Sequence, residues 1–216
     1  MKQRSSRSGW LIAGLVTVAF ALGFVAGLFA PRLAEEVRAM MAPRSEVRQF
    51  PDAGTTGVPQ GVELQPSGSI TVTQDGSVVE GLHVTGEIKI AANNVTIRNT
   101  LVRTDTPTYP IHVTEGVTGA LIEHVEVHNM GSTGKGIYFD GGSGTVRNAN
   151  IHSAEDGIRI SADAVTVEYS YIHDLARHEG GHHDSIQIRR GDDITLRGNN
   201  LQIYVASTDD PMNAAL

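Results

Sequence analysis

The feature that most constrains this chain is a nine-residue segment that recurs six times between residues 77 and 202. In every copy an aliphatic residue at the third position is followed, five residues later, by a second aliphatic residue. The copies occupy residues 77–85, 95–103, 120–128, 144–152, 165–173 and 194–202. A repeat of this length indicates a solenoid, in which equivalent positions of successive coils lie on top of one another.

A second, shorter pattern precedes five of these copies. It is a triplet in which a more polar residue stands between two apolar ones, and the triplets occupy residues 88–90, 111–113, 137–139, 158–160 and 186–188. This period of two is typical of a β-strand with one buried face. Because Gly, Asn and Asp separate each triplet from the following copy, we expect turns there and two or three short strands in each coil.

These patterns predict an all-β fold, a right-handed parallel β-helix of about six coils. A helical solenoid is excluded because no copy has apolar residues at positions i, i+3, i+4 and i+7. A leucine-rich repeat is excluded because the copies lack its leucines and its helix. An antiparallel sandwich is the remaining alternative, although it does not require successive copies to match position by position. The β-helix predicts in particular that Ile158 lies directly between Ile137 and Ile186.

The repeats follow a segment with the character of a membrane anchor. Residues 10–30 are uncharged and mostly apolar, and residues 1–9 are basic. A helix of this length spans the hydrocarbon core of a bilayer, and the basic flank predicts a cytoplasmic N-terminus. We expect a single-pass signal anchor in the cell membrane, with the C-terminal domain outside the cytoplasm; a cleaved signal and secretion are the alternative. Residues 31–61 would form a juxtamembrane helix and a Pro/Gly-rich tether, and residues 62–216 the β-helix domain.

The charge of the repeat region limits its partners. Residues 51–216 carry 10 basic and 21 acidic residues, together with all nine His. An acidic surface repels phosphate backbones, so we expect no nucleic-acid partner. The chain has no Cys, which excludes disulfide bonds, thiolate metal sites and a cysteine nucleophile.

Charged residues collect just before the triplets of three consecutive coils. Lys135, Asp156 and Asp184 occupy equivalent positions there, with Glu155 and His183 next to them in sequence. Since Ca²⁺ prefers carboxylate oxygens, Asp156, Asp184 and Glu155 are a candidate calcium site. Asp-Gly before a strand is also an ordinary turn whose carboxylate caps backbone N–H groups, and this structural interpretation stays open.

The middle residues of the triplets point outward and form a neighbouring column, which contains His112, Tyr138, Arg159 and Gln187. All of these except Arg159 are candidate substrate-binding residues. Arg159, Lys135 and His183 are candidates for removing a proton beside a substrate carboxylate, a step that also needs a cation to neutralise the developing charge.

A third column directly follows the second aliphatic position and contains Arg103, His128, His152, His173 and Gln202. Three stacked imidazoles suit a transition metal, but no carboxylate in the column orients a ring, so a neutral ladder is the alternative. The longest interval contains residues 173–184, which we expect to project as a loop over Asp156 and Asp184. Its HEGGH stretch lacks the His-Glu-x-x-His spacing of a zinc protease.

From about residue 57 onward the chain resembles the pectate lyase-like right-handed β-helix superfamily, and within it exported bacterial right-handed β-helix proteins. The resemblance rests on residues 67–88, 93–100, 154–158, 169–175 and 182–188. In the last of these segments Ser185 stands where the group's His-x-Asp-Gly-Ile-Gln pattern has Gly. The resemblance implies the lyases and C5-epimerases of that superfamily as activities. It also implies further coils beyond Leu216, so we expect a C-terminally truncated fragment.

Together these observations predict an extracytoplasmic protein that acts on an acidic polysaccharide, as a lyase that cleaves a uronic-acid polymer by β-elimination. A C5-epimerase is an alternative, since both reactions begin with removal of the same proton. A non-catalytic glycan-binding or scaffold module on the cell surface is the other. The chain is only 5% aromatic, which counts against a strong carbohydrate groove.

Overall fold

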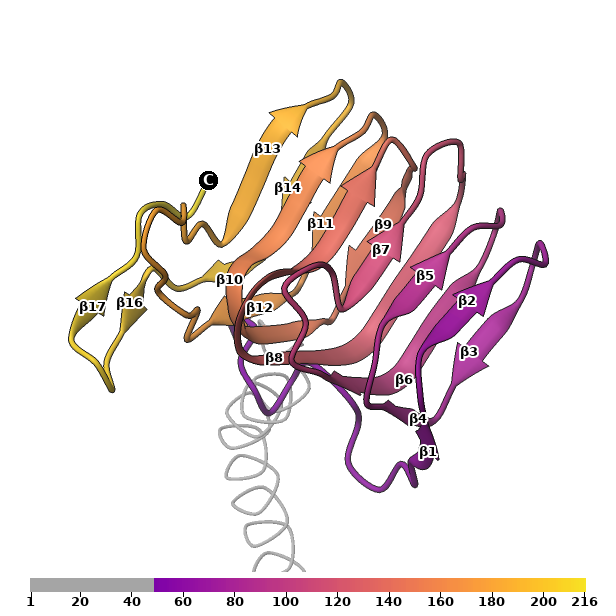
Figure 1. The fold of residues 1–216 in the computed structure, drawn as a ribbon, viewed down its shortest axis with the longest axis horizontal. Helices are drawn as coiled ribbons and strands as arrows, with labels where there is room; N and C mark the ends of the chain where they lie inside the picture. Colours follow the sequence, from indigo (N-terminus) through magenta and orange to yellow (C-terminus); the bar gives the residue numbers. More distant parts are fainter. Residues whose placement is uncertain (1–48) are drawn as a thin grey trace, which may run out of the picture. The chain divides into compact units, whose positions relative to one another are not determined.

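The computed structural model describes residues 49–216, whose strands wind into a solenoid (Figure 1). Fifteen strands pair in parallel, and each complete coil passes through three faces before the next coil begins. No helix occurs among the described residues, and their only antiparallel pair joins β16 (Tyr204–Val205) to β17 (Asp210–Pro211). The prediction of an all-β, parallel solenoid is therefore confirmed, and the antiparallel sandwich is excluded.

Most strands belong to a single face. Face 1 contains β1 (Gln65–Ser67), β4 (Leu82–Val84), β12 (Tyr171–His173) and β15 (Asn200–Leu201). Face 2 contains β2 (Ile70–Val72), β5 (Ile88–Ile90), β7 (Ile111–Val113) and β13 (Ile186–Arg190). Face 3 contains β3 (Val78–Glu80), β9 (Gly144–Arg147), β11 (Val165–Glu168) and β14 (Thr195–Arg197).

Three longer strands continue around the corners between faces. β6 (Thr96–Arg103) runs from face 3 to face 1, and β10 (Asn150–Ser161) runs from face 1 to face 2. β8 (Ala120–Asp140) passes through all three faces. These strands hold neighbouring faces at a fixed angle, so side chains on either side of a corner keep a defined spacing.

The register of the strands matches the repeat in the sequence. Ile158 pairs with Ile137 on one side and with Ile186 on the other, as predicted. The first aliphatic positions stack from coil to coil, in the order Val79, Ile97, Ile122, Val146, Val167 and Leu196. The second positions stack as well, in the order Val84, Val102, Val127, Ile151, Ile172 and Leu201.

Each nine-residue copy bends at its fifth residue, where the chain turns from face 3 to face 1. These residues all have φ between 49° and 67°, in the left-handed region, and are Gly81, Asn99, His124, Asn148, Tyr169 and Gly198. Gly and Asn adopt this conformation most readily. The corner thus explains why the two aliphatic residues of a copy are five residues apart and still both point inward.

The three faces enclose an aliphatic core. Phe139 and eleven isoleucines are the largest side chains that are fully buried among residues 49–216. Burying one such side chain stabilises a fold by about 1.5–3 kcal/mol. The core is less well covered from solvent in the last coil, where Ile188 is 44% exposed.

The structure adds two strands that the sequence patterns did not identify. β1 and β2 form the first coil, and Ile70 and Val72 of β2 pair with Ile88 and Ile90 of β5. At the other end, the N–H groups of Ser185 and Ile186 donate to the carbonyls of Ala214 and Ala215, so residues 214–215 lie beside β13. Pairing therefore extends by two strands at the N-terminal end, and by an isolated bridge between Asp184 and Ala214 at the C-terminal end, beyond what the aligned copies indicate.

Segments assigned to the anchor and to most of the tether, residues 1–48, lie outside the described residues. Within residues 49–216 no helix is long and apolar enough to cross a membrane. Residues 50–61 contact the solenoid: the N–H of Gly57 donates to the carbonyl of Asn148, and the amide of Asn200 donates to the carbonyl of Pro51. The division of the chain into anchor, tether and repeat domain stays a prediction.

Candidate functional site

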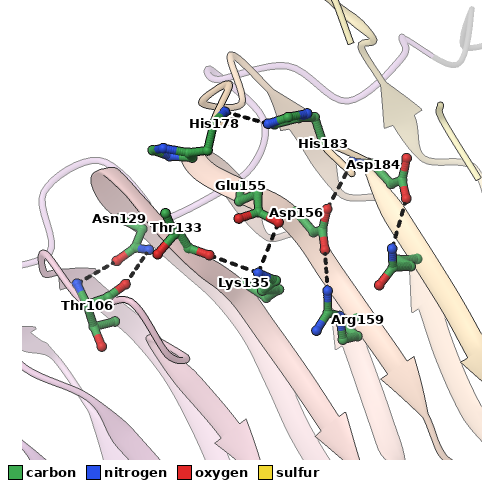
Figure 2. Close-up of polar contacts among 11 residues, drawn as sticks. Thr106, Asn129, Thr133, Lys135, Glu155, Asp156, Arg159, His178, His183 and Asp184 are labelled. Atoms are coloured by element: carbon green, nitrogen blue, oxygen red, sulfur yellow. Dashed lines mark hydrogen bonds and ion pairs between the residues drawn. The ribbon is translucent and has the colours of Figure 1, made fainter. Parts of the chain in front are cut away.

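The predicted charged residues meet at the corner where the chain turns from face 1 to face 2. Lys135 of β8 pairs in register with Asp156 of β10, and the N–H of Asp184 on the next coil donates to Oδ1 of Asp156 at 3.1 Å. Figure 2 shows these three coils side by side. We call Lys135, Glu155, Asp156, Arg159 and Asp184 the charged patch.

Asp156 is the centre of this patch and has no exposed surface. Its Oδ2 accepts a hydrogen bond from Nη2 of Arg159 at 3.0 Å, while Oδ1 accepts the N–H of Asp184 (Figure 2). A buried carboxylate is stable only when it is paired and hydrogen-bonded, and Asp156 meets both conditions. Its two oxygens therefore hold Arg159 and the following coil in place.

The other charges of the patch are also paired. Nζ of Lys135 lies 3.0 Å from Oε1 of Glu155 and donates to the carbonyl of Thr133 at 2.9 Å. Oδ2 of Asp184 accepts the side-chain amide of Gln187 at 3.1 Å. Nζ of Lys135 is therefore engaged by a carboxylate and by a carbonyl within the same corner.

His183 lies in the loop above the patch and is almost fully buried. Its Nε2 accepts the backbone N–H of His178 at 2.5 Å, and its Nδ1 has no hydrogen-bond partner among the described residues. Burial lowers the pKa of His183, and the Arg177 guanidinium lowers it further. The ring is therefore neutral with its proton on Nδ1, and the lone pair that a base would use is occupied.

The loop of residues 173–184 folds back against the patch. A Cβ at Gly181 would lie 2.8 Å from Nε2 of His183 and 2.9 Å from Cδ of Glu155, so both side chains flank this glycine closely. Leu175 is buried in the core. The loop thus covers Glu155, in line with the overhang expected from its length.

The three acidic residues do not form a calcium site in this structure. Among residues 49–216 no three His, Asp or Glu side chains converge closely enough to hold a metal ion. The oxygens of Asp156 face Arg159 and a backbone N–H, and Glu155 faces Lys135. Two cations within the patch oppose a third, so we assign no step to bound calcium.

Three rings pack together on the outer surface of face 2, and we call them the ring stack. The ring of Tyr138 lies 4.6 Å from that of Tyr109 and 5.6 Å from that of His112, which is nearly parallel to it. The hydroxyl of Tyr138 donates to Oδ1 of Asp140 at 3.1 Å. The predicted column of His112, Tyr138, Arg159 and Gln187 is confirmed by the register of the strands.

Tyr109 is the member of the ring stack that the repeat patterns missed, because it lies in the turn that precedes β7. Asn129 fixes this turn: its amide oxygen accepts the N–H of Thr106 at 3.1 Å, and its amide nitrogen donates to the Thr106 carbonyl at 2.9 Å (Figure 2). The hydroxyls of Thr106 and Thr108 both donate to Glu87. The only signal in the sequence is an aromatic residue within a Pro/Thr-rich turn.

Three buried polar atoms on face 2 have no hydrogen-bond partner among residues 49–216. They are Nε2 of His112, Nε of Arg159 and Oε1 of Gln187, which come from different coils of the same column. Nε2 of His112 lies 3.5 Å from Asp140, close enough for an ion pair but without a hydrogen bond. Buried polar groups normally have partners, so a line of unpartnered ones indicates contacts with water or a ligand.

Face 1 carries the predicted histidine column, and its rings do stack. The ring of His152 lies 4.5 Å from that of His128 and 5.2 Å from that of His173. Carboxylates also reach the ladder from outside the column: Glu126 lies 3.5 Å from His152, and Asp174 lies 2.6 Å from His173. Burial lowers the pKa of both His128 and His173, which favours the neutral ladder over a charged one.

A comparison with known families agrees with the parallel register. A family described as right handed beta helix region matches residues 60–204. No curated protein and no solved structure matches the chain. The match covers most of the residues that form the three faces, including the charged patch and the ring stack.

Proposed function

We propose that the function of this chain, which belongs to the right-handed β-helix family, lies on the outer surface of face 2, and that this surface binds an acidic polysaccharide. The observation that carries this proposal is the column that combines the ring stack with Arg159 and Gln187. Successive coils of a β-helix are about 4.8 Å apart, so this column offers a regular series of contacts to a polymer. The same fold supports many functions, so the proposal rests on this surface and not on the family.

Each part of the surface has a task in binding a polymer of acidic sugars. The faces of Tyr109 and Tyr138 supply apolar area against which the C–H groups of a sugar ring pack. On the adjacent coil Arg159 supplies a planar guanidinium that suits the carboxylate of a uronic acid. Gln187, which is almost fully buried, donates its side-chain amide to Oδ2 of Asp184 and so fixes the end of the column next to Arg159.

A local cation is needed because the body of the protein is acidic. Residues 51–216 carry about twice as many acidic as basic residues. An acidic polymer would be repelled by the general field and attracted where a cation such as Arg159 presents its positive charge at short range. Asp156 neutralises part of that charge, but it also fixes the direction in which the guanidinium points.

Cleavage by β-elimination is the second candidate function, favoured by the contact between Tyr138 and Asp140 on the coil next to Arg159. In this reaction a base removes the proton beside the carboxylate, a carbon–carbon double bond forms, and the glycosidic oxygen leaves with a proton. Arg159 would neutralise the charge that develops. The oxygen of Tyr138 would take the proton from carbon while its own hydroxyl proton passes to Asp140, which then gives a proton to the departing glycosidic oxygen. A C5-epimerase would begin with the same step and return the proton to the opposite side.

Two variants of Tyr138 distinguish polymer binding from polymer cleavage. The full chain, purified in a mild nonionic detergent, is titrated with pectate, alginate and neutral dextran. We expect pectate or alginate to bind and dextran not to bind. Tyr138→Ala should weaken binding about tenfold, which corresponds to about 1.4 kcal/mol. Tyr138→Phe keeps the ring and should leave binding unchanged.

The exposed tyrosine of the β16–β17 hairpin provides the matched control, and Tyr204→Ala should bind as the unaltered protein does. Ultraviolet absorbance of an unsaturated product reports elimination, and Tyr138→Phe should abolish it. Binding without any product in the unaltered protein refutes the lyase and keeps the glycan-binding module. If neither acidic polymer binds, or if Tyr138→Ala binds normally, the proposal for face 2 is wrong.

A further inference from the structure

A hollow lies away from the outer surface of face 2, at the corner where β8 and β10 leave face 1. It has a volume of about 380 Å³, and the residues that line it include Arg103, His128, Met130, Ser153, Asp174 and Leu175. Met130, Ser153 and Asp174 all have φ between 42° and 58°, in the left-handed region. These three left-handed residues, one on each of three successive coils, all line the hollow. We call it the corner pocket.

Arg103 gives the corner pocket its positive charge. The residue is exposed and makes no ion pair within residues 49–216, whereas Lys135 and Arg159 of the charged patch are both paired. His128, next to it in the ladder, is kept neutral because burial and the neighbouring His152 lower its pKa. The pocket therefore presents one available guanidinium to an anion.

The rest of the lining suits a ligand that also has hydroxyl groups and an apolar side. The Asp174 side chain is 54% exposed, and a carboxylate accepts hydrogen bonds from hydroxyls. Neutral His128 provides one donor and one acceptor. Met130, which is 53% exposed, and buried Leu175 form an apolar surface. Asp174 also repels a compact dianion such as phosphate, so a monoanion is favoured.

We propose that the corner pocket binds a single sugar acid, with its carboxylate on Arg103, its hydroxyls on Asp174 and His128, and its C–H face on Met130. A pocket of about 380 Å³ falls in the range of small-molecule sites and is too small for several units of a polymer. This site is separate from the polymer surface of face 2, and neither proposal requires the other. Its ligand is a monomer free in solution.

The test follows the ring signals of histidine by NMR in the full chain, labelled with ¹³C-histidine. The signal of His128 is assigned by its loss in His128→Gln. Galacturonate and glucuronate are titrated separately, with galactose, acetate and inorganic phosphate as comparisons. We expect at least one sugar acid to shift the His128 signal saturably, and galactose, acetate and phosphate to bind at least tenfold more weakly.

Variants of Arg103 test whether its positive charge binds the carboxylate of the sugar acid. Arg103→Gln should weaken binding of the sugar acid at least tenfold, and Arg103→Lys should restore part of it. Arg190→Gln, which removes an exposed arginine at a different corner, should leave binding unchanged. The proposal is overturned if neither sugar acid shifts His128, if Arg103→Gln binds normally, or if acetate or phosphate binds as tightly as the sugar acid.

Failure of this proposal and failure of the face 2 proposal give different results. Tyr138→Ala should leave the His128 titration unchanged, and Arg103→Gln should leave binding of pectate or alginate unchanged. A protein that binds only the polymer refutes the corner pocket alone. One that binds only the monomer refutes the face 2 surface alone.

Discussion

The ion pair between Asp156 and Arg159 should contribute more to stability than any exposed pair in the domain. Asp156 has no exposed surface, and its Oδ2 lies 3.0 Å from Nη2 of Arg159, whose side chain is 19% exposed. Removing the charge of either side chain leaves the charge of the other without its partner in a poorly hydrated position. We consider Asp156→Asn, Arg159→Gln and the variant that carries both changes.

The geometry sets the expected magnitudes. Two unit charges 3.0 Å apart interact by about 5.5 kcal/mol at an effective dielectric constant of about 20, before desolvation is subtracted. Breaking a buried pair on one side costs about 3–5 kcal/mol. Asp156→Asn should cost about 3 kcal/mol, because Arg159 regains some water and the Asn oxygen still accepts the N–H of Asp184. Arg159→Gln should cost about 4 kcal/mol, because the carboxylate stays buried.

The double variant should cost only about 1–2 kcal/mol, since two neutral amides replace the ion pair and no charge is left alone. The measurement is thermal unfolding of the full chain by circular dichroism, where 1 kcal/mol corresponds to a shift in Tm of about 2–4 °C. Arg98→Gln is the control, because the pair of Arg98 with Glu80 is exposed and its loss should leave Tm unchanged. The double-mutant cycle then gives the coupling free energy of the pair.

Two results would refute this reasoning. If the costs of the single variants simply add in the double variant, the two side chains are not coupled. If each single variant shifts Tm no more than Arg98→Gln does, the pair is not buried as described. Either result would also remove the reason for the fixed direction of Arg159 on face 2.

Two further predictions concern the core and the histidine ladder. Ile158→Ala should lower the free energy of unfolding by about 2–5 kcal/mol, because Ile158 is fully buried between Ile137 and Ile186. Denaturant titration measures this change, and a loss below about 1 kcal/mol would contradict the stacked register. The pKa values of His128 and His173 are lowered by burial, so the folded chain binds fewer protons than the unfolded chain between those lowered values and about 6.5. The contribution of these histidines to the free energy of unfolding should therefore be fully present above about pH 6.5. It should decrease as the pH falls from about 6.5 to the lowered pKa values. Denaturation midpoints across this range give the slope of stability against pH. If His173→Gln shows an equally steep slope, groups other than His173 cause the pH dependence.

The sequence was sufficient for most of the candidate site as well as the fold. Once the copies are aligned, the register places Lys135 beside Asp156 and Arg159 between Tyr138 and Gln187, because equivalent positions in a solenoid touch. The alignment could not show which of these charges neutralise one another. Glu155 is adjacent to Asp156 in sequence, yet Lys135 reaches Glu155 while Arg159 reaches Asp156.

By itself the sequence determined the winding of the chain, since the repeated aliphatic positions have only one arrangement in which all of them are buried. Tertiary structure alone decided the course of the longer loops between copies, because those segments share no residue-by-residue repeat and their course depends on contacts between coils. The loop over Glu155 occupies the lone pair of His183, and a turn held by Asn129 brings Tyr109 onto Tyr138. The corner pocket is likewise lined by three left-handed residues that come from successive coils.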